Sequence, residues 1–547
     1  MRLLDRRIGL LFAVFLLLLV AIGMRAAWLG TVRAGSLKQR AVTQQVEDLE
    51  VTARRGTITD RHGVELAVAE DAVSVFANPF LVKDPAAAAA KLAPILGRPA
   101  EELTKTLGDR KKGYVYLRRK MDAGVAEKVD KLKIEGVGTV GEPRRVYPQG
   151  ALAGQLLGIV GTDNLGLSGL EQQYERDLHG SNGHRRLVKD ALGEPVSIVE
   201  SDRAQAGKDI RLTIDAALQE RVEAVMDDVG RKHRPRGATT VVMDPRNGEV
   251  LALSNWPRAD PTDIGAASAY TLTNRAVAAS YEPGSTFKAF TVAGALEEGV
   301  VRPGSRFDLP PILKVADREI EDAHDRGPVN LSVAEILAQS SNVGAATIGL
   351  NLGKRRFAGW VSRFGFGRAT GVGLPGEAPG IVLSPDRYYG STLGNMAIGQ
   401  GLAVTPLQMA AGFSAIGNGG VLHRPRVILG EGEPGRRVIS RRTSGQVVKM
   451  LEGVIGAGGT GQEAEVPGYR LAGKTGTAEK PDPKTGGYSK FKFFSSFIGF
   501  APAREPRLMI AVMVDEPKGL YYGGDVAAPA FEQILQFALP YLRIPPR

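Results

Sequence analysis

The chain of 547 residues contains no cysteine, which excludes disulfide bonds, thiolate nucleophiles and cysteine-ligated zinc. It has only six histidines, and none of them shows the His-Glu-x-x-His spacing of a helical zinc site. A P-loop and a convincing dinucleotide-binding fingerprint are also missing. We therefore expect no metal and no cofactor, so any catalysis must come from ordinary side chains.

A basic stripe with interleaved aromatic residues is missing as well, so nucleic-acid binding is not expected. The net charge of +11 favours anionic surfaces such as phospholipid headgroups or wall polymers, although a generally basic solvated surface explains it equally well. Hydrophobic residues make up 43% of the chain and charged residues 24%, so the chain can bury a core and is not disordered. The length allows two to four domains.

Only one long apolar run is present, from Ile8 to Met24, and three arginines precede it. A helix over this run is roughly 25 Å long, and residues 26–29 extend it toward the thickness of a hydrocarbon core. The basic residues favour a cytoplasmic N-terminus. A cleaved signal peptide is the alternative, but its apolar region is usually shorter, about 7–15 residues. We expect a cytoplasmic tail at 1–7 and a single-pass signal anchor at 8–29, with the rest outside the cytoplasmic membrane.

Beyond the anchor, the pattern of the chain changes near Gly207. Residues 30–206 carry no catalytic pattern, and we expect them to form a β-rich, non-catalytic pedestal domain. Residues 207–547 place strand patterns at both ends and helical patterns between them, which is typical of an α+β domain. The patterns predict hairpins at 55–63 and between 239–243 and 250–254, strands at 209–214, 469–473, 493–500 and 508–514, and helices from 85 and at 123–133, 216–229, 331–338 and 528–539.

The first of three short motifs in the second region is Ser285-Thr-Phe-Lys288. Glu282-Pro-Gly284 precedes it and helix-forming residues follow, so Ser285 is expected in the first turn of a helix with Lys288 on the same face. The helix N-terminus would stabilise developing negative charge. A second Ser-x-x-Lys, Ser489 to Lys492, lies in an alternating strand pattern, where residues three apart face opposite sides. We therefore select Ser285 as the nucleophile.

The other two motifs are Ser340-Ser-Asn342 and Lys474-Thr-Gly-Thr477. The first follows a helical stretch, so it lies at a helix end, where a C-terminal cap by Asn342 is the structural alternative. Lys474 follows an apolar strand, whereas a second Lys-Thr-Gly at Lys484 lies among turn residues. Gly476 would let a substrate backbone approach closely.

Together the motifs contain the groups that acyl transfer requires. A serine hydroxyl such as that of Ser285 is a poor nucleophile until a base removes its proton, and Lys288 is that base only when it is neutral. Lowering the pKa of a lysine from about 10.4 to near 7–8 requires burial and a neighbouring cation, and Lys474 would be that cation. The shift corresponds to a free-energy difference of roughly 4 kcal/mol between the two protonation states. Ser340 would relay a proton and Asn342 would hold a substrate amide.

Backbone and hydroxyl groups would complete the site. The N–H groups of Ser285 and Thr477 form the natural oxyanion hole. The hydroxyls of Thr475 and Thr477 would bind a terminal carboxylate.

These motifs resemble those of class B penicillin-binding proteins, and of the division-specific, FtsI-type branch most of all. The resemblance extends over nearly the whole chain, through the following stretches: Arg55–Gly63, Arg145–Pro148, Gly169–Glu171, Tyr281–Lys288, Ser340–Asn342, Ala397–Gly401, Thr405–Gln408, Lys474–Ala478 and Tyr521–Gly524. It implies a membrane-anchored pedestal, also called a dimerisation domain, and a transpeptidase domain whose antiparallel sheet lies between helix clusters.

The resemblance also implies an activity and partners. The activity is D,D-transpeptidation of peptidoglycan stem peptides ending in D-Ala-D-Ala, through an acyl-enzyme on Ser285 that β-lactams also form. The partners are an FtsW-type glycosyltransferase and other divisome proteins. The elongation branch shares the three motifs, whereas the short chain and the Tyr521–Gly524 stretch favour division during septal wall synthesis.

Four other classes of protein are alternatives to this assignment. A class A β-lactamase needs a deacylating glutamate in Glu-x-x-Leu-Asn, but Thr347 stands at that position before Leu350-Asn351. A bifunctional penicillin-binding protein needs Glu-Asp-x-x-Phe, but Ser74 follows Glu70-Asp71 where phenylalanine is required. A β-lactam sensor and a divisome scaffold with a vestigial site remain alternatives, although the intact motifs argue against a scaffold.

Overall fold

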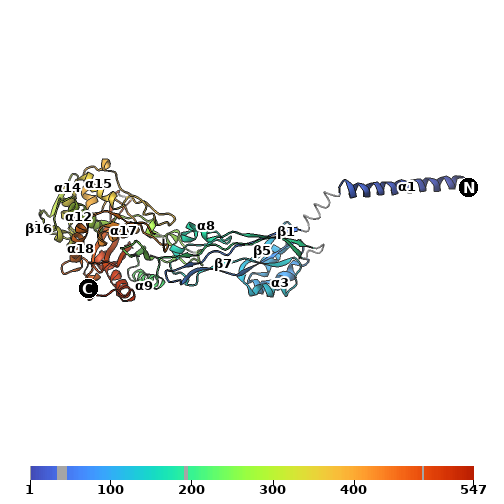
Figure 1. Cartoon of the computed structure of the whole chain (residues 1–547), viewed down its shortest axis with the longest axis horizontal. Coiled ribbons are helices and arrows are strands. Elements are labelled where there is room, and N and C mark those ends of the chain that lie inside the picture. Colours follow the sequence, from blue (N-terminus) through green and yellow to red (C-terminus); the bar gives the residue numbers. More distant parts are fainter. Residues whose placement is uncertain are drawn as a thin grey trace. The chain divides into compact units, whose positions relative to one another are not determined.

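The computed structural model describes residues 2–33, 46–189, 195–265, 267–430, 432–482 and 486–546. The chain forms two compact units, and it passes between them several times (Figure 1). The first unit comprises Met1–Arg54, Asp71–Arg144 and Gly180–Gly207, and the second comprises Arg55–Glu70, Arg145–His179 and Lys208–Arg547. Each unit is described separately below.

The N-terminal helix α1 covers Arg2–Thr31. Its segment Arg7–Thr31 is long and apolar enough to cross a membrane, as expected from the sequence. Large apolar side chains such as Leu11 and Leu17 are about 70% exposed, because no other part of the described chain covers them. A helix that is hydrophobic on all sides and uncovered by protein is suited to a lipid environment.

The rest of the first unit contains two three-stranded antiparallel sheets and short helices. The strand order of its main sheet is β5-β4-β6, and a second sheet has the order β1-β8-β9. Asp84 begins α3 as expected, because its carboxylate accepts hydrogen bonds from the N–H groups of Ala86 and Ala87. The elements are β1 (Val46–Val51), β4 (Ala72–Ala77), α3 (Pro85–Leu96), α4 (Ala100–Gly108), β5 (Val115–Asp122), α5 (Gly124–Asp130), β6 (Val137–Gly141), β8 (Gly183–Lys189) and β9 (Pro195–Asp202).

The second unit is built on a five-stranded antiparallel sheet of order β12-β11-β21-β20-β19. The elements of this sheet are β11 (Gly237–Met243), β12 (Val250–Trp256), β19 (Ala472–Pro481), β20 (Tyr488–Ala501) and β21 (Leu508–Asp515). Smaller strands are β2 (Ile58–Thr59), β3 (Glu65–Glu70), β7 (Arg144–Val146), β10 (Ile210–Arg211), β13 (Arg306–Leu309), β14 (Ile312–Val315), β15 (Arg318–Glu321), β16 (Val329–Ser332), β17 (Val421–Leu422) and β18 (Arg436–Arg437).

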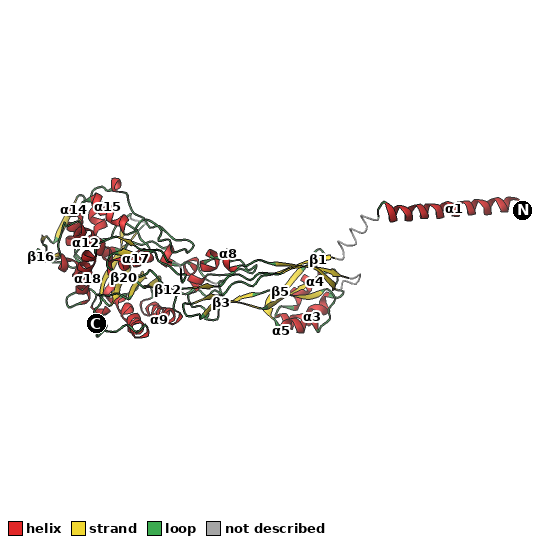
Figure 2. Cartoon of the chain, viewed as in Figure 1, coloured by secondary structure: helices red, strands yellow, loops and turns green. Residues whose placement is uncertain are grey.

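Helices cover both faces of this sheet (Figure 2). The helices of the second unit are α6 (Gly154–Leu157), α7 (Gly169–Gln173), α8 (Glu175–Leu178), α9 (Ala216–His233), α10 (Ala269–Leu272), α11 (Arg275–Ala278), α12 (Lys288–Glu297), α13 (Val333–Ala338), α14 (Asn342–Leu352), α15 (Lys354–Arg363), α16 (Thr392–Ala397), α17 (Pro406–Gly417), α18 (Arg441–Ile455), α19 (Gly523–Val526) and α20 (Ala528–Tyr541). The 3₁₀ turns are η1 (Gly284–Phe287), η2 (Pro385–Arg387) and η3 (Gln462–Ala464).

The two faces of the sheet belong to different cores. In β21, Met509, Ala511 and Met513 belong to the same hydrophobic core as residues of α12, α14 and α17, whereas the alternate residues Ile510 and Val512 belong to the core that contains residues of α9 and α20. A strand covered on both faces reads as a continuous apolar run, and this is why Leu508–Val514 is apolar throughout. The expected α+β class, with an antiparallel sheet between helix clusters, is confirmed.

Most of the helices and strands predicted from the sequence are present, but several begin or end at other residues than predicted. The 239–243 and 250–254 hairpin pairs as predicted, and β2 pairs antiparallel with β3 around the 55–63 turn. The strand predicted at 469–473 instead begins at Ala472 and continues through the third motif. The strand predicted at 209–214 is only Ile210–Arg211, and the helix predicted at 123–133 ends at Asp130.

Candidate active site

Ser285 lies in the 3₁₀ turn η1, which runs directly into α12. The sequence prediction of a first helical turn is therefore confirmed, with a tighter first turn than an α-helix. The preceding Gly284 has a φ of 54°. A Cβ at Gly284 would also lie 3.1 Å from the Cβ of Ala478 on β19, so glycine permits this close approach. Ser285 itself is half-buried and remains accessible to solvent.

Lys288, one turn after Ser285, is completely buried. Its Nζ donates to the backbone oxygen of Ser340 at 2.5 Å and to Asn342 Oδ1 at 2.6 Å. It also lies 3.3 Å from Ser340 Oγ. The first and second motifs, more than fifty residues apart in sequence, thus meet at one ammonium or amine nitrogen.

The second motif connects two helices. Helix α13 ends at Ala338 and α14 begins at Asn342, so Asn342 opens a helix rather than capping the end of one. Ser340 has a φ of 60°, a left-handed conformation that is uncommon for serine. Ser341 caps α14 by accepting a hydrogen bond from the Gly344 N–H at 3.0 Å. This turn directs the Ser340 and Asn342 side chains toward Lys288.

Asp322, which the sequence analysis missed, holds this turn in place. Its carboxylate accepts hydrogen bonds from the N–H groups of Asn342 at 2.5 Å and Val343 at 3.0 Å, and from Ser341 Oγ. Arg326 Nε pairs with it at 2.5 Å. The pKa of Asp322 lies below its usual value. Burial alone would raise this pKa, but the hydrogen bonds to the carboxylate have the larger combined effect. No local sequence pattern marks this residue, because the turn that it holds lies about twenty residues further along the chain.

The third motif lies on β19, beside the catalytic turn. Lys474 is completely buried, and its Nζ lies 3.2 Å from the Thr475 carbonyl oxygen and 3.4 Å from Thr475 Oγ1. Thr477 Oγ1 accepts a hydrogen bond from the Gly523 N–H at 3.0 Å. Internal packing also favours glycine at position 476, since a Cβ there would lie 2.4 Å from Ser496 Oγ.

The two buried lysines have lowered pKa values. Burial lowers the pKa of Lys288 to about 7, and the nearby Asp322 charge opposes this shift. The pKa of Lys474 is lowered well below its usual value by burial and then by repulsion from Lys288. Burial and the Lys474 charge together were expected to lower the Lys288 pKa. Burial does lower it, whereas the repulsion between the two lysines lowers the pKa of Lys474 instead. A neutral Lys288 is accessible near pH 7.

The second copies of the Ser-x-x-Lys and Lys-Thr-Gly motifs lie in other surroundings. Ser489 and Lys492 lie on β20, as the alternating pattern predicts, and the Lys492 side chain is 60% exposed. Lys484 lies outside the described residues.

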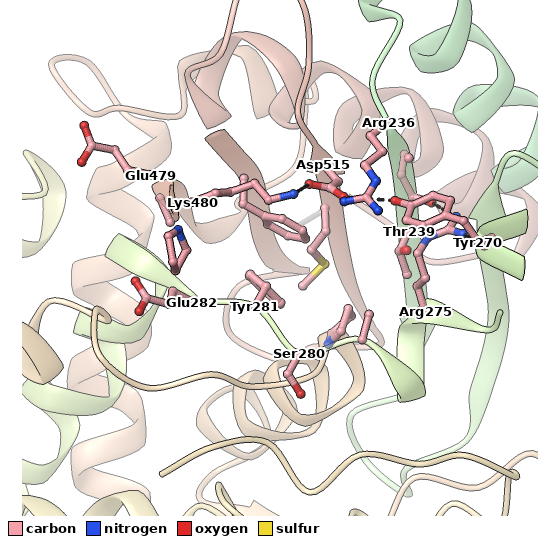
Figure 3. Close-up of a pocket in the computed structure, with 18 residues that line it drawn as sticks. Arg236, Thr239, Tyr270, Arg275, Ser280, Tyr281, Glu282, Glu479, Lys480 and Asp515 are labelled. Carbon is pink, nitrogen blue, oxygen red and sulfur yellow. Dashed lines mark hydrogen bonds and ion pairs between the residues drawn. The ribbon is translucent and has the colours of Figure 1, made fainter. Parts of the chain in front are cut away.

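A cavity of about 260 Å³ adjoins the catalytic turn (Figure 3). Tyr281 and Glu282, just before Ser285, form one wall, and Lys480, just after the third motif, lines another. Lys480 Nζ and the Tyr270 hydroxyl contact Asp515 at 2.5 and 3.1 Å (Figure 3). The cavity therefore touches both segments that carry catalytic candidates, but not the candidates themselves.

Comparisons with known proteins agree with this geometry. Residues 238–536 match the model of the penicillin-binding protein transpeptidase domain, and residues 50–212 match that of the penicillin-binding protein dimerisation domain. The chain is 36% identical to stage V sporulation protein D of Bacillus subtilis, covering 98% of this chain and 86% of the relative. It is 33% identical to the peptidoglycan D,D-transpeptidase FtsI of Escherichia coli K12, covering 99% and 92%.

Solved structures are similar over most of the chain. Penicillin-binding protein 3 of Mycobacterium tuberculosis, complexed with aztreonam, superposes with a TM-score of 0.71 at 29% identity, covering 91% of this chain and 98% of that one. Penicillin-binding protein 2X of Streptococcus thermophilus gives 0.75 at 25% identity, covering 90% and 80%. Both domain models, their order and these full-length matches agree: the chain belongs to the class B penicillin-binding proteins.

Proposed function

We propose that this chain is a peptidoglycan D,D-transpeptidase that cross-links stem peptides through an acyl-enzyme on Ser285 and is acylated by β-lactams at the same residue. One observation carries the proposal. The completely buried Lys288 nitrogen, with a pKa near 7, contacts Ser340 and Asn342 one turn away from a solvent-accessible serine. A scaffold with a vestigial site has no need of a buried, neutralisable lysine, because such a group costs stability.

In the acylation step, Ser285 Oγ attacks the carbonyl carbon of the penultimate D-alanine. Neutral Lys288 takes the serine proton as the new ester bond forms. The peptide bond to the terminal D-alanine then breaks, and Ser340 passes the proton from Lys288 to the departing amine. The products are free D-alanine and an ester on Ser285.

The second step reverses these roles. An acceptor amine from another stem peptide attacks the ester carbonyl, and its proton returns through Ser340 and Lys288 to Ser285 Oγ. Ser285 is released and a new amide bond forms. The backbone N–H groups of Ser285 and Thr477 stabilise the oxyanion in both steps.

The third motif binds the donor peptide. The terminal carboxylate of the donor would accept hydrogen bonds from the hydroxyls of Thr475 and Thr477, with Gly476 between them on β19. Lys474 would supply positive charge to this pocket when it is protonated, and Asn342 would hold the amide of the donor. The location of Thr475, Gly476 and Thr477 on β19 and of Asn342 at the start of α14 supports this part of the proposal.

We place this activity in septal wall synthesis, with an FtsW-type glycosyltransferase and other divisome proteins as partners. The similarity to FtsI of Escherichia coli supports this placement, and an elongation role is the alternative. We propose that α1 anchors the chain with its N-terminus in the cytoplasm, because Arg2, Arg6 and Arg7 precede the apolar span. We also propose a pedestal at 30–206 and a transpeptidase domain at 207–547.

The direct test is release of D-alanine from a stem peptide that ends in D-Ala-D-Ala, with an amine acceptor present, measured together with the cross-linked product by mass spectrometry. The full chain should form the cross-linked product, and Ser285→Ala should form none. Rapid penicillin hydrolysis without a stable adduct would instead identify a β-lactamase. Full cross-linking by Ser285→Ala would refute the assignment.

A further inference from the structure

A second concave surface lies in the second unit, and none of the catalytic candidates lines it. It is a groove of about 1170 Å³. Helix α18 forms one side, the turn between β20 and β21 forms another, and the segment that follows α17 completes it. The proposed transpeptidation uses no residue of this groove, so its composition needs a separate explanation.

The rim of the groove is basic. Arg441 and Lys449 line it from α18, and Arg504 and Arg507 line it from the facing turn. All four are exposed, and among the residues that the structure describes none of them forms an ion pair. A fifth cation, Arg246, is neutralised by Asp244 at 2.5 Å. Clustered cations along a concave surface attract anionic partners.

Two carboxylates also line the groove. Glu452 pairs with Arg470, which lies outside the lining, at 3.2 Å, and Glu505 has a partner of its own. Four exposed cations therefore face two carboxylates that already have partners, and the groove keeps an excess of positive charge.

The lining also contains Gly445, Val448 and Pro506, here called the floor, together with polar residues such as Ser444 and Asn418. Gly445 occupies the fifth position of α18, where glycine costs about 1 kcal/mol relative to alanine. A Cβ at Gly445 would meet no atom within 4 Å, so internal packing does not require glycine there. The buried side chains of Val448, on the same helix, and Pro506, on the facing turn, also line the groove. This floor allows the main chain of a ligand to approach the helix closely.

We propose that this groove binds an extended acidic peptide segment of another protein, with apolar residues alternating between the acidic ones. Arg441 and Lys449 are roughly 12 Å apart along the helix axis, which about four residues of an extended strand would span. Successive side chains of such a strand point to opposite sides. Acidic side chains would thus contact the basic rim while alternate apolar side chains contact Val448 and Pro506.

The start of α18 is unsuited to a phosphate group. The Thr443 N–H already donates to Ser440 Oγ at 3.1 Å, and the Glu297 carboxylate accepts from the Ser440 N–H at 3.1 Å. A carboxylate therefore already occupies the place where a phosphate would bind a helix N-terminus. The dispersed cations and apolar floor fit a peptide better than a compact anion.

The test is fluorescence anisotropy of a labelled Glu-Val alternating peptide of about eight residues, titrated with the full chain in a nonionic detergent. Two groove variants are informative: Gly445→Trp, which fills the floor, and the double variant Lys449→Glu with Arg504→Glu. Their matched controls lie on α15. Gly359 is also an exposed helical glycine with open space at its Cβ, so Gly359→Trp matches the first variant, and Lys354→Glu with Arg355→Glu matches the change in net charge.

We expect both groove variants to weaken peptide binding by about tenfold or more, and both controls to stay within about twofold of the wild type. A Glu-Gly peptide of the same length should bind more weakly, and a Lys-Val peptide should not bind. Penicillin acylation of Ser285 should be unchanged in all variants, which verifies folding.

Four results would overturn the proposal. In the first, the Glu-Val peptide does not bind, and in the second, groove and control variants lose binding equally. In the third, the Glu-Gly peptide binds as well as the Glu-Val peptide and tripolyphosphate displaces it. In the fourth, phosphatidylglycerol vesicles bind in a groove-dependent way and the peptide does not bind. The third result would indicate a simple anion site, and the fourth a lipid-binding surface.

Discussion

Two segments of the second unit share the Ser-x-x-Lys pattern but differ in every property that catalysis requires. Lys288 follows Ser285 on a helical turn and is completely buried against Ser340 and Asn342. Lys492 follows Ser489 on β20, is 60% exposed and lies 3.8 Å from Glu516. The difference shows that burial and backbone geometry, and not the Ser-x-x-Lys sequence alone, allow a lysine to act as a base.

The largest effect should come from removing the base itself. Lys288→Met should slow acylation by penicillin about 10²- to 10⁴-fold, the usual contribution of a positioned general base. Lys492→Met should leave the acylation rate within about twofold, because the Lys492 side chain is 60% exposed and its ion-pair partner Glu516 is not a catalytic candidate. Stopped-flow acylation of the full chain measures both. A similar loss in the two variants would remove the distinction between the segments.

Adjacent arginines extend the comparison to stability. Arg55 is buried and pairs with Glu171 at 2.5 Å and Glu175 at 2.7 Å, whereas the exposed Arg54 pairs with the exposed Asp71. Arg55→Ala should lower the local unfolding free energy by about 1.5–3 kcal/mol, since the buried Glu171 keeps Arg145 but loses a charged hydrogen-bond donor. Arg54→Ala should cost about 0–1 kcal/mol.

Native-state hydrogen exchange over residues 164–178 measures this opening free energy without assuming that the whole chain unfolds in one step. Equal protection of these amides from exchange in the two arginine variants would contradict the claim that the buried ion pair contributes more to stability than the exposed one.

A smaller effect should follow from Asp322→Asn. The wild-type acylation rate should rise with pH through about 7, since Lys288 acts as a base only after losing its proton. Asp322 raises the Lys288 pKa, so removing its charge should move this rise to lower pH. The variant should also acylate roughly ten- to a hundredfold more slowly, because the Asn342 and Val343 N–H groups lose a charged acceptor.

The matched control for Asp322 is Asp325→Asn, an exposed carboxylate on the same loop. It should change neither the rate nor the pH profile of acylation by penicillin. A rise that stays near pH 7 in Asp322→Asn would contradict the assigned electrostatic influence on Lys288.

The smallest effect is expected at Tyr281, which stacks on Phe494 with ring centroids 4.1 Å apart. Its buried hydroxyl has no hydrogen-bond partner among the described residues. Tyr281→Phe should therefore leave the thermal stability unchanged or raise it slightly, because an unsatisfied polar group is removed. Thermal unfolding with acylation as a second readout tests this, and a clear loss of stability would show that the hydroxyl has a partner.

The sequence predicted the α+β class, the 239–254 hairpin and the helical position of Ser285, because these depend on local periodicity and turn chemistry. It did not predict the ends of β10 or the position of β19 after Tyr469, since long-range pairing decides where a strand begins. Asp322 was also missed. Its role depends on contacts with a turn twenty residues away, and no spacing rule describes them.

The most direct test of the central claim is the intact mass of the full chain after incubation with a penicillin, for the wild type, Ser285→Ala and Ser489→Ala. The account predicts one stable adduct on the wild type and on Ser489→Ala, and none on Ser285→Ala. An adduct on Ser285→Ala, or its loss in Ser489→Ala, would contradict the assignment of the nucleophile.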